Sequence, residues 1–321
     1  MILWQFVILT FGLALLWAGA EVMVNNSIKL ARAQGISPLV IGLTVVSIGT
    51  SIPELGVSSL AAFQDNIGIS IGNIIGSNIA NLGLILGVGA LILPLKIKTS
   101  WVRREVPYMI FVTIVFLVIA YSGYVILWYE GFVLLALLSL FLLYVGRFTL
   151  KEMSEFKEMA EENGVERVPR STKIKYLAMA FVGIAILLAG SQLSVMSGTK
   201  LAGILGVSDS IIGLTLIALG TSLPELATTI VGATRKSVDL VVGNVIGSNI
   251  FNLALIGGLT ALIRPIPIDL EAKLMDIEFP LLIFISLLVW PMMRFRWNIE
   301  RYEGFILLSI YVVFIYFTIG V

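Results

Sequence analysis

The chain of 321 residues contains no cysteine and no histidine, and only 13% of its residues are charged. Without cysteine, the protein has neither a disulfide framework nor a thiolate metal site. Without histidine, it lacks the usual side chain for zinc binding and for acid–base chemistry near neutral pH. Carboxylates must therefore carry any chemistry that needs an ionisable group.

Apolar residues dominate the composition. Hydrophobic side chains make up 58% of the chain and the mean hydropathy is +1.02, whereas about a quarter of the residues of a soluble domain are charged. The composition predicts an integral membrane protein surrounded by the lipid bilayer. The formal net charge of +1 gives no reason to expect a nucleic-acid partner.

Ten apolar runs are long enough to cross a bilayer, which takes about 20 residues per helix. They lie near residues 4–30, 37–63, 68–93, 104–121, 124–146, 175–202, 208–234, 239–263, 274–293 and 302–320. The first run lacks the basic start of a signal peptide, so we assign it as a helix. The expected fold is an all-α, multi-pass protein of the cell membrane with ten transmembrane helices.

The second five runs repeat the first five. Residues 212–266 match residues 41–95 at 27 of 55 positions when the two segments are aligned without gaps. Because each copy holds an odd number of spans, the copies enter the membrane in opposite directions, as in the inverted-topology repeats of secondary transporters. The predicted domains are a first repeat at 1–147, a cytoplasmic linker at 148–173 and a second repeat at 174–321.

Basic residues predict the orientation. The loops after spans 1, 3, 5, 7 and 9 hold 18 of the 21 Lys and Arg residues, and cytoplasmic loops carry such an excess. Both termini are therefore predicted to face outside. The linker at 148–173 then lies in the cytoplasm, where its pattern predicts a short amphipathic helix before Pro169.

Each copy carries one carboxylate inside an apolar span. The sequence Gly-Thr-Ser-x-Pro-Glu occupies residues 49–54 and 220–225 and ends on Glu54 and Glu225. A charged side chain costs about 2.5–3.5 kcal/mol at the centre of a membrane helix on insertion scales. Neither span contains Lys, Arg or His, so a bound cation or a proton is left to neutralise each glutamate. Glu21 has no acidic counterpart in the second copy, which favours a place on a helix face outside the ion site.

A proline breaks each of these helices. Pro53 has no N–H and its ring clashes with the preceding turn, so backbone carbonyls near Gly49 and Thr50 lose their helical partners. Such breaks occur at membrane depth only where protein or water surrounds them. Thr50, Ser51 and Glu54 fall on one helix face. Hydroxyl, carboxylate and carbonyl oxygens together suit a hard cation such as calcium or sodium.

The third span of each copy adds a second motif, Gly-Asn-x-x-Gly-Ser-Asn-x-x-Asn, at residues 72–81 and 243–252. Its glycines let two backbones approach closely, so the polar faces of the two copies can meet near the membrane midplane. We expect helices 2, 3, 7 and 8 to be broken around this point. The expected side-chain ligands are Thr50, Ser51, Glu54, Ser77 and Asn81 with Thr221, Ser222, Glu225, Ser248 and Asn252.

These two motifs, each occurring twice at one spacing, resemble the sodium/calcium exchangers of the cation/calcium antiporter superfamily, especially the short prokaryotic and archaeal members. The resemblance covers nearly the whole chain. It implies a ten-helix antiporter that binds calcium between the two glutamates and sodium around them, with backbone carbonyls of Ser47 and Ala218 as further ligands. It also implies that helices 1 and 6 move across a fixed site. The chain departs from the pattern at Asn252, where several members carry an aspartate, and it lacks the large cytoplasmic sensor domains of animal exchangers.

The leading hypothesis is electrogenic exchange of sodium for calcium by alternating access, with no cofactor and no protein partner, in a protein that acts as a monomer. Antiport driven by protons is the alternative, since buried glutamates also bind protons. A cation channel would more often place its ligands in rings made by oligomeric symmetry. An intramembrane enzyme would need a nucleophile and a base at membrane depth, and the sequence shows no such pair.

Overall fold

The computed structural model describes residues 2–97, 99–162, 168–205, 218–268 and 274–320. Helices make up nearly all of this part of the chain, and η marks a π-helical segment. The first half contains α1 (Ile2–Gln34), α2 (Pro38–Ile41), η1 (Gly42–Val46), α3 (Ser47–Thr50), α4 (Ile52–Phe63), α5 (Ile67–Ala80), η2 (Asn81–Ile85), α6 (Leu86–Ile92), α7 (Thr99–Gly123) and α8 (Trp128–Glu162). The second half contains α9 (Arg170–Ile204), α11 (Ala218–Thr221), α12 (Leu223–Thr234), α13 (Val238–Ile250), η4 (Phe251–Ile256), α14 (Gly257–Ile263), η5 (Leu274–Glu278), α15 (Phe279–Arg294) and α16 (Arg301–Gly320).

The prediction of an all-helical, multi-pass membrane protein is confirmed. Within the described ranges, eight helices are long and apolar enough to cross a bilayer, and the bent pair Pro38–Thr50 and Ile52–Phe63 adds a ninth span. The bounds of most of these spans lie within a few residues of those predicted. The seventh predicted span, 208–234, lies partly outside the described residues, and its described part forms α11 and α12.

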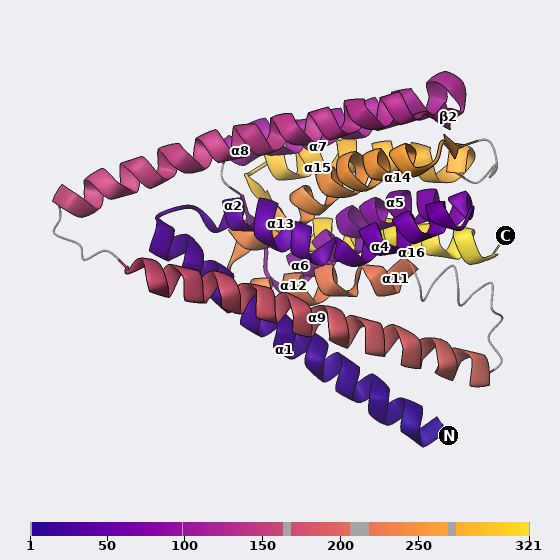
Figure 1. Ribbon diagram of the computed structural model, residues 1–321, viewed down its shortest axis with the longest axis horizontal. Helices are drawn as coiled ribbons and strands as arrows, with labels where there is room; N and C mark the ends of the chain where they lie inside the picture. Colours follow the sequence, from indigo (N-terminus) through magenta and orange to yellow (C-terminus); the bar gives the residue numbers. More distant parts are fainter. Residues whose placement is uncertain (1, 98, 163–167, 206–217, 269–273, 321) are drawn as a thin grey trace.

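Long helices enclose a core of shorter ones (Figure 1). Helices α7 and α8 run along one side and the crossed pair α1 and α9 along the other, with α4, α5, α12 and α13 between them. The start of α1 and the end of α16 lie at the right-hand end of Figure 1, and the end of α8 and the start of α9 lie at the opposite end. The shorter helices that carry the two repeated motifs therefore occupy the middle of the molecule.

Glycines hold α1 and α9 together at backbone contact. A Cβ added at Gly19 would lie 2.3 Å from the Leu187 nitrogen, and one added at Gly190 would lie 2.3 Å from the Leu16 nitrogen. Real Cβ atoms do not approach backbone so closely, so each contact requires glycine. Small residues allow this approach inside a membrane, where van der Waals packing drives helix association.

Two short antiparallel sheets connect the halves of the chain. Strand β1 (Leu95–Lys96) pairs with β4 (Asn298–Ile299), with Leu95 opposite Ile299. Strand β2 (Val125–Ile126) pairs with β3 (Ile266–Pro267), with Ile126 opposite Ile266. Each sheet thus joins a loop of the first half to a loop of the second.

The segment predicted as a linker is largely helical and packs on the rest of the protein. Helix α8 continues without a break to Glu162, so the described part of the amphipathic helix expected before Pro169 is the end of this long helix. The Ser37 backbone N–H donates to Glu152 Oε2 at 2.9 Å. The Phe156 ring covers Gly35, whose φ of +73° favours glycine. This end of α8 therefore contacts the turn between α1 and α2.

Candidate functional site

The two Gly-Thr-Ser-x-Pro-Glu motifs break their helices as the sequence predicts. Ser51 has φ −83° and ψ 5°, and Ser222 has φ −88° and ψ 3°, values outside the regular helix. At the first break the two helical pieces bend by 43°. The glutamates follow in the first turns of α4 and α12. The positive N-terminal end of each helix dipole favours a carboxylate there.

The expectation of broken helices is wrong for spans 3 and 8. Residues Ile67–Ile92 and Val238–Ile263 each form one continuous helical span. Both spans instead contain a π-helical segment, η2 from Asn81 and η4 around Asn252. A π-segment inserts one extra residue into the helix and is frequent at functional sites. The helical span continues through it, so no helix end is exposed to lipid.

The predicted side-chain ligands are buried inside the protein, and the two glutamates lie close to each other. Glu54 and Glu225 are each 1% exposed. The Glu54 carboxylate lies close to Glu225, Ser222 and Thr221, and the Glu225 carboxylate lies close to Thr50 and Ser51. Each glutamate therefore faces the broken helix of the other copy. The remaining predicted ligands with described side chains are also buried, namely Ser77, Asn81, Ser248 and Asn252.

Most of these side chains make no hydrogen bond in the described part of the chain. Buried polar atoms normally have a partner, because an unmade hydrogen bond costs about 1–3 kcal/mol. The unpartnered buried oxygens include both carboxylate oxygens of Glu54 and of Glu225, together with the side-chain oxygens of Ser51, Ser77, Asn81, Ser222, Ser248 and Asn252. Unpartnered oxygens on both copies of the two motifs fit a site for hard cations, which bind oxygen ligands.

The site combines two negative charges with neutral oxygens. Among the residues that the structure describes, no three Asp, Glu, His or Cys side chains gather as a metal cluster. The arrangement is therefore unlike a carboxylate-rich structural calcium site. Two ionised carboxylates carry a charge of −2, which is equal and opposite to the charge of one divalent cation.

Two asparagines that sequence reasoning did not assign to the site link it across the repeats. The Thr50 hydroxyl donates to Asn244 Oδ1 at 3.2 Å, and the Thr221 hydroxyl donates to Asn73 Oδ1 at 3.3 Å. Thr50 also lies 3.4 Å from the Ser47 carbonyl. Their place in the repeated motif was the available signal, although nothing in the sequence identified their partners.

The two backbone ligands implied by the family resemblance lie just before the breaks. Ser47 begins α3, where its carbonyl accepts the Ser51 N–H at 3.0 Å. A carbonyl oxygen has a second lone pair that a cation can use. Ala218 begins α11.

Helix α9 touches both breaks. The Ser191 hydroxyl donates to the Gly220 carbonyl at 3.0 Å. A Cβ added at Gly220 would lie 2.3 Å from the Val195 side chain, and one at Gly49 would lie 2.5 Å from Ile184. Ser191 does not stand out in the sequence, because its counterpart in the first repeat is Ala20.

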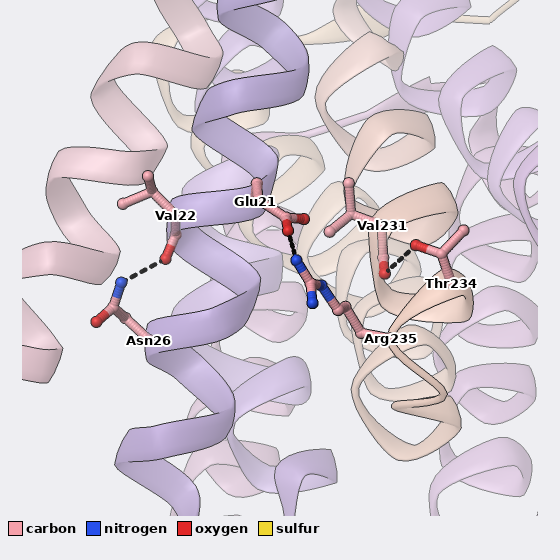
Figure 2. A network of polar contacts seen from close by, with 6 residues as sticks. All are labelled: Glu21, Val22, Asn26, Val231, Thr234 and Arg235. Carbon is pink, nitrogen blue, oxygen red and sulfur yellow. Dashed lines mark hydrogen bonds and ion pairs between the residues drawn. The ribbon is translucent and has the colours of Figure 1, made fainter.

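An ion pair connects helix α1 to the C-terminal end of α12, the helix that carries Glu225. Figure 2 shows the Glu21 carboxylate facing the Arg235 guanidinium, with which it forms an ion pair. Arg235 caps the C-terminal end of α12, where the helix dipole favours a positive charge. Beside the pair, Asn26 and Thr234 donate to carbonyls of their own helices. Glu21 thus has a partner outside the site.

Comparison with known proteins agrees with this geometry. The family model described as "Sodium/calcium exchanger protein" matches residues 4–147 and 175–320. The chain belongs to the sodium/calcium exchanger family. This exchanger chain is 36% identical over 349 residues to the sodium/calcium exchanger MaX1 of Methanosarcina acetivorans, covering 98% of both chains. It is 36% identical over 311 residues to the putative antiporter CaxA of Alkalimonas amylolytica, covering 95% of both.

A solved structure gives the same result for the fold. The sodium-calcium exchanger NCX_Mj, in a crystal soaked with Na+ and Sr2+, superimposes with a TM-score of 0.82 at 34% identity over 98% of each chain. The exchanger is thus a multi-pass membrane transporter of the cation/calcium antiporter type, and its family moves ions without catalysing a covalent reaction. The family expected from the two repeated motifs is confirmed.

Proposed function

We propose that this exchanger carries out sodium-driven calcium antiport at a site built from both repeats. One observation carries the proposal: in Glu54 and Glu225 both carboxylate oxygens are buried without a hydrogen-bond partner, and so are side-chain oxygens of the hydroxyl and amide residues of the same motifs. Calcium binds six to eight oxygens, including carboxylates and carbonyls. The proposed side-chain ligands are Thr50, Ser51, Glu54, Ser77, Asn81, Thr221, Ser222, Glu225, Ser248 and Asn252, with the carbonyls of Ser47 and Ala218.

Sodium is the driving ion that these ligands favour. Hydroxyl and amide oxygens coordinate sodium, and they do not titrate in the physiological range. The relatives MaX1 and NCX_Mj are both named as sodium/calcium exchangers. CaxA is named only as a putative antiporter, and the two facing glutamates also fit proton-driven antiport, which is the second candidate.

An inverted repeat of five plus five helices would give the site its alternating access. The strands that follow spans 3 and 8 are β1 and β3, and each pairs with a loop of the other half. The hydrogen bonds of the site also cross between the halves: Thr50 of the first half contacts Asn244 of the second, and Thr221 of the second half contacts Asn73 of the first. Such reciprocal contacts support a two-fold relation between the halves. In this proposal α1 and α9 slide as one unit across the site.

A single chain then provides a complete site in the bilayer, because both repeats contribute ligands. Transport at this site needs no cofactor and no second subunit. We expect both termini to face outside. The two ends of the chain lie at one end of the molecule in Figure 1, which fits termini on the same side of the membrane, and the basic loops predict which side that is. Sodium and calcium ions are the transported substrates.

Ion binding tests the proposal directly. Calcium titrated into the purified protein should release heat, sodium should suppress the binding, and potassium at the same concentration should not. The Glu54→Gln variant should lose the calcium signal while it elutes from a sizing column like the wild type. Calcium binding that is unaffected by sodium and is suppressed by lowering the pH would favour the proton-driven alternative.

A further inference from the structure

Asn73 occupies a position between the two copies of the site. Its Nδ2 donates to the Glu54 carbonyl at 3.1 Å and to the Ser58 hydroxyl at 2.8 Å. Its Oδ1 accepts the hydroxyl of Thr221, which belongs to the other copy. Asn73 is buried. This one amide therefore connects the backbone of the first glutamate to a threonine of the second repeat.

The direction of the Asn73 amide is fixed by its neighbours. A backbone carbonyl only accepts hydrogen bonds, so the amide nitrogen must face Glu54. The amide oxygen then faces Thr221, and the Thr221 hydroxyl must act as the donor. Two hydrogen bonds to Ser70 hold Ser58 in place. The Ser58 hydroxyl donates to the Ser70 carbonyl at 3.3 Å, and the Ser70 hydroxyl donates to the Ser58 carbonyl at 3.0 Å. The Asn73 oxygen that accepts the Thr221 hydroxyl is therefore held in place by the bonds of the Asn73 nitrogen.

The position of the hydroxyl proton decides whether a threonine can bind a cation. A hydroxyl has one proton and two lone pairs, and a cation is attracted to a lone pair and repelled by the proton. When the proton points at an asparagine oxygen, the lone pairs are left for the site. An asparagine provides that acceptor without adding a third negative charge beside Glu54 and Glu225.

Asn244 has the corresponding role for Thr50. The Thr50 hydroxyl is closer to Asn244 Oδ1, at 3.2 Å, than to the Ser47 carbonyl, at 3.4 Å. Donation to Asn244 leaves the Ser47 carbonyl for an ion. The Asn244 nitrogen has no hydrogen-bond partner in the described part of the chain, so this copy of the arrangement has fewer structural bonds than the first.

We infer that Asn73 and Asn244 are positioning residues that orient the hydroxyls of Thr221 and Thr50 toward the ions, each acting on the opposite repeat. The inference rests on the proposed function, because it concerns the same cation site. It assigns a role to two residues of the repeated motif that are not themselves ligands. It also couples the repeats: a displacement of one copy moves the acceptor used by the other.

A double-mutant cycle on calcium affinity tests the inference. Asn73→Ala, Asn244→Ala, Thr50→Val and Thr221→Val are made singly and in four pairs, and the calcium Kd of each is measured by titration. Each asparagine substitution should weaken binding by about two- to tenfold, the range of one net hydrogen bond. In the matched pairs, Asn73 with Thr221 and Asn244 with Thr50, the second substitution should add little.

The mismatched pairs are the control. Asn73 with Thr50, and Asn244 with Thr221, should show fold-changes that multiply, because no hydrogen bond joins them in the described structure. A residue that only stabilises the fold would give the same behaviour in matched and mismatched pairs, and that result overturns the inference. If Asn73→Ala does not fold, the Asn244 and Thr50 pair gives the same comparison with fewer structural bonds at risk. Wild-type protein that binds no calcium would overturn the proposed function itself.

Discussion

The charge of each site glutamate should matter more than its shape. Glu54→Gln and Glu225→Gln keep the size of the side chain and remove its negative charge. Each variant therefore leaves the site with one of its two negative charges to attract calcium. We expect calcium transport to fall at least about a hundredfold in either variant, since losing one ion pair with a buried charge costs about 3–5 kcal/mol. The measurement is uptake of labelled calcium into proteoliposomes.

Glu105 provides the matched control for this prediction. It is another buried glutamate and lies on α7, outside the site. Its Oε1 accepts a hydrogen bond from the Tyr144 hydroxyl at 3.3 Å. Glu105→Gln should transport calcium at close to the wild-type rate. Equal losses in Glu105→Gln and Glu54→Gln would show that any buried carboxylate is needed for folding, and the site assignment would fail.

At this scale the sequence predicted the residues whose chemistry stands out. A carboxylate in an apolar span without a basic partner indicates a site by itself, and Glu54 and Glu225 lie together as expected. Asn73, Asn244 and Ser191 were missed because an amide or a hydroxyl in a membrane helix more often bonds within its own helix. Asn78 and Asn249 do this, each bonding to the carbonyl four residues before it at 2.7 Å.

Among the elements, the α1 and α9 pair depends on glycine. A Cβ at Gly190 would lie 2.3 Å from the Leu16 nitrogen and 2.7 Å from the Gly12 carbonyl. Gly190→Val should therefore push the helices apart and destabilise the protein by about 1–3 kcal/mol, as overpacking does. The measurement is the thermal unfolding midpoint in detergent, which should fall by several degrees.

Gly146 is the control for this substitution. It lies in α8, is exposed, and an added Cβ meets nothing within 4 Å among the described residues. Gly146→Val should leave the unfolding midpoint nearly unchanged. Similar falls in both variants would mean that valine destabilises these helices through backbone effects, and the close contact between α1 and α9 would not explain the result.

Element positions follow from hydrophobicity more readily than element details. The length of each apolar run predicts its span because the bilayer sets that length. The π-segments at Asn81 and Asn252 were not predicted, since one inserted residue barely changes a hydrophobic pattern. The polar residues of the α8 extension to Glu162 predict a linker. The contacts of this extension with Gly35 and Ser37 depend on the fold, and the sequence of the extension does not indicate them.

For the whole molecule, the orientation is the first prediction to check. The chain has no native cysteine, so a single introduced thiol reports on one position. Ser122 and Ser171 are both exposed, near the end of α7 and the start of α9. Ser122→Cys should react with an impermeant thiol reagent added outside intact cells, and Ser171→Cys should not. The reverse pattern of labelling would place both termini in the cytoplasm.

The charge of the complete site predicts a response to voltage. Glu54 and Glu225 supply two negative charges, while Asn81 and Asn252 supply none. One calcium ion leaves the site neutral, whereas three sodium ions leave it with one positive charge. Exchange of three sodium ions for one calcium ion should therefore shift with membrane potential by about 2.3 kcal/mol per 100 mV. Proteoliposomes clamped with potassium and valinomycin give the measurement, and a balance point that is independent of voltage would require two sodium ions per calcium.

The central claim is that sodium drives calcium across the membrane through the two-glutamate site. In the most direct test, three sets of proteoliposomes are prepared: one with an outward sodium gradient, one with an outward proton gradient and one with neither. The measurement is the entry of labelled calcium from outside. An outward sodium gradient should drive uptake in the wild type and leave Glu54→Gln at the background of empty liposomes. Uptake that follows the proton gradient, or that proceeds equally without either gradient, would contradict sodium-driven antiport.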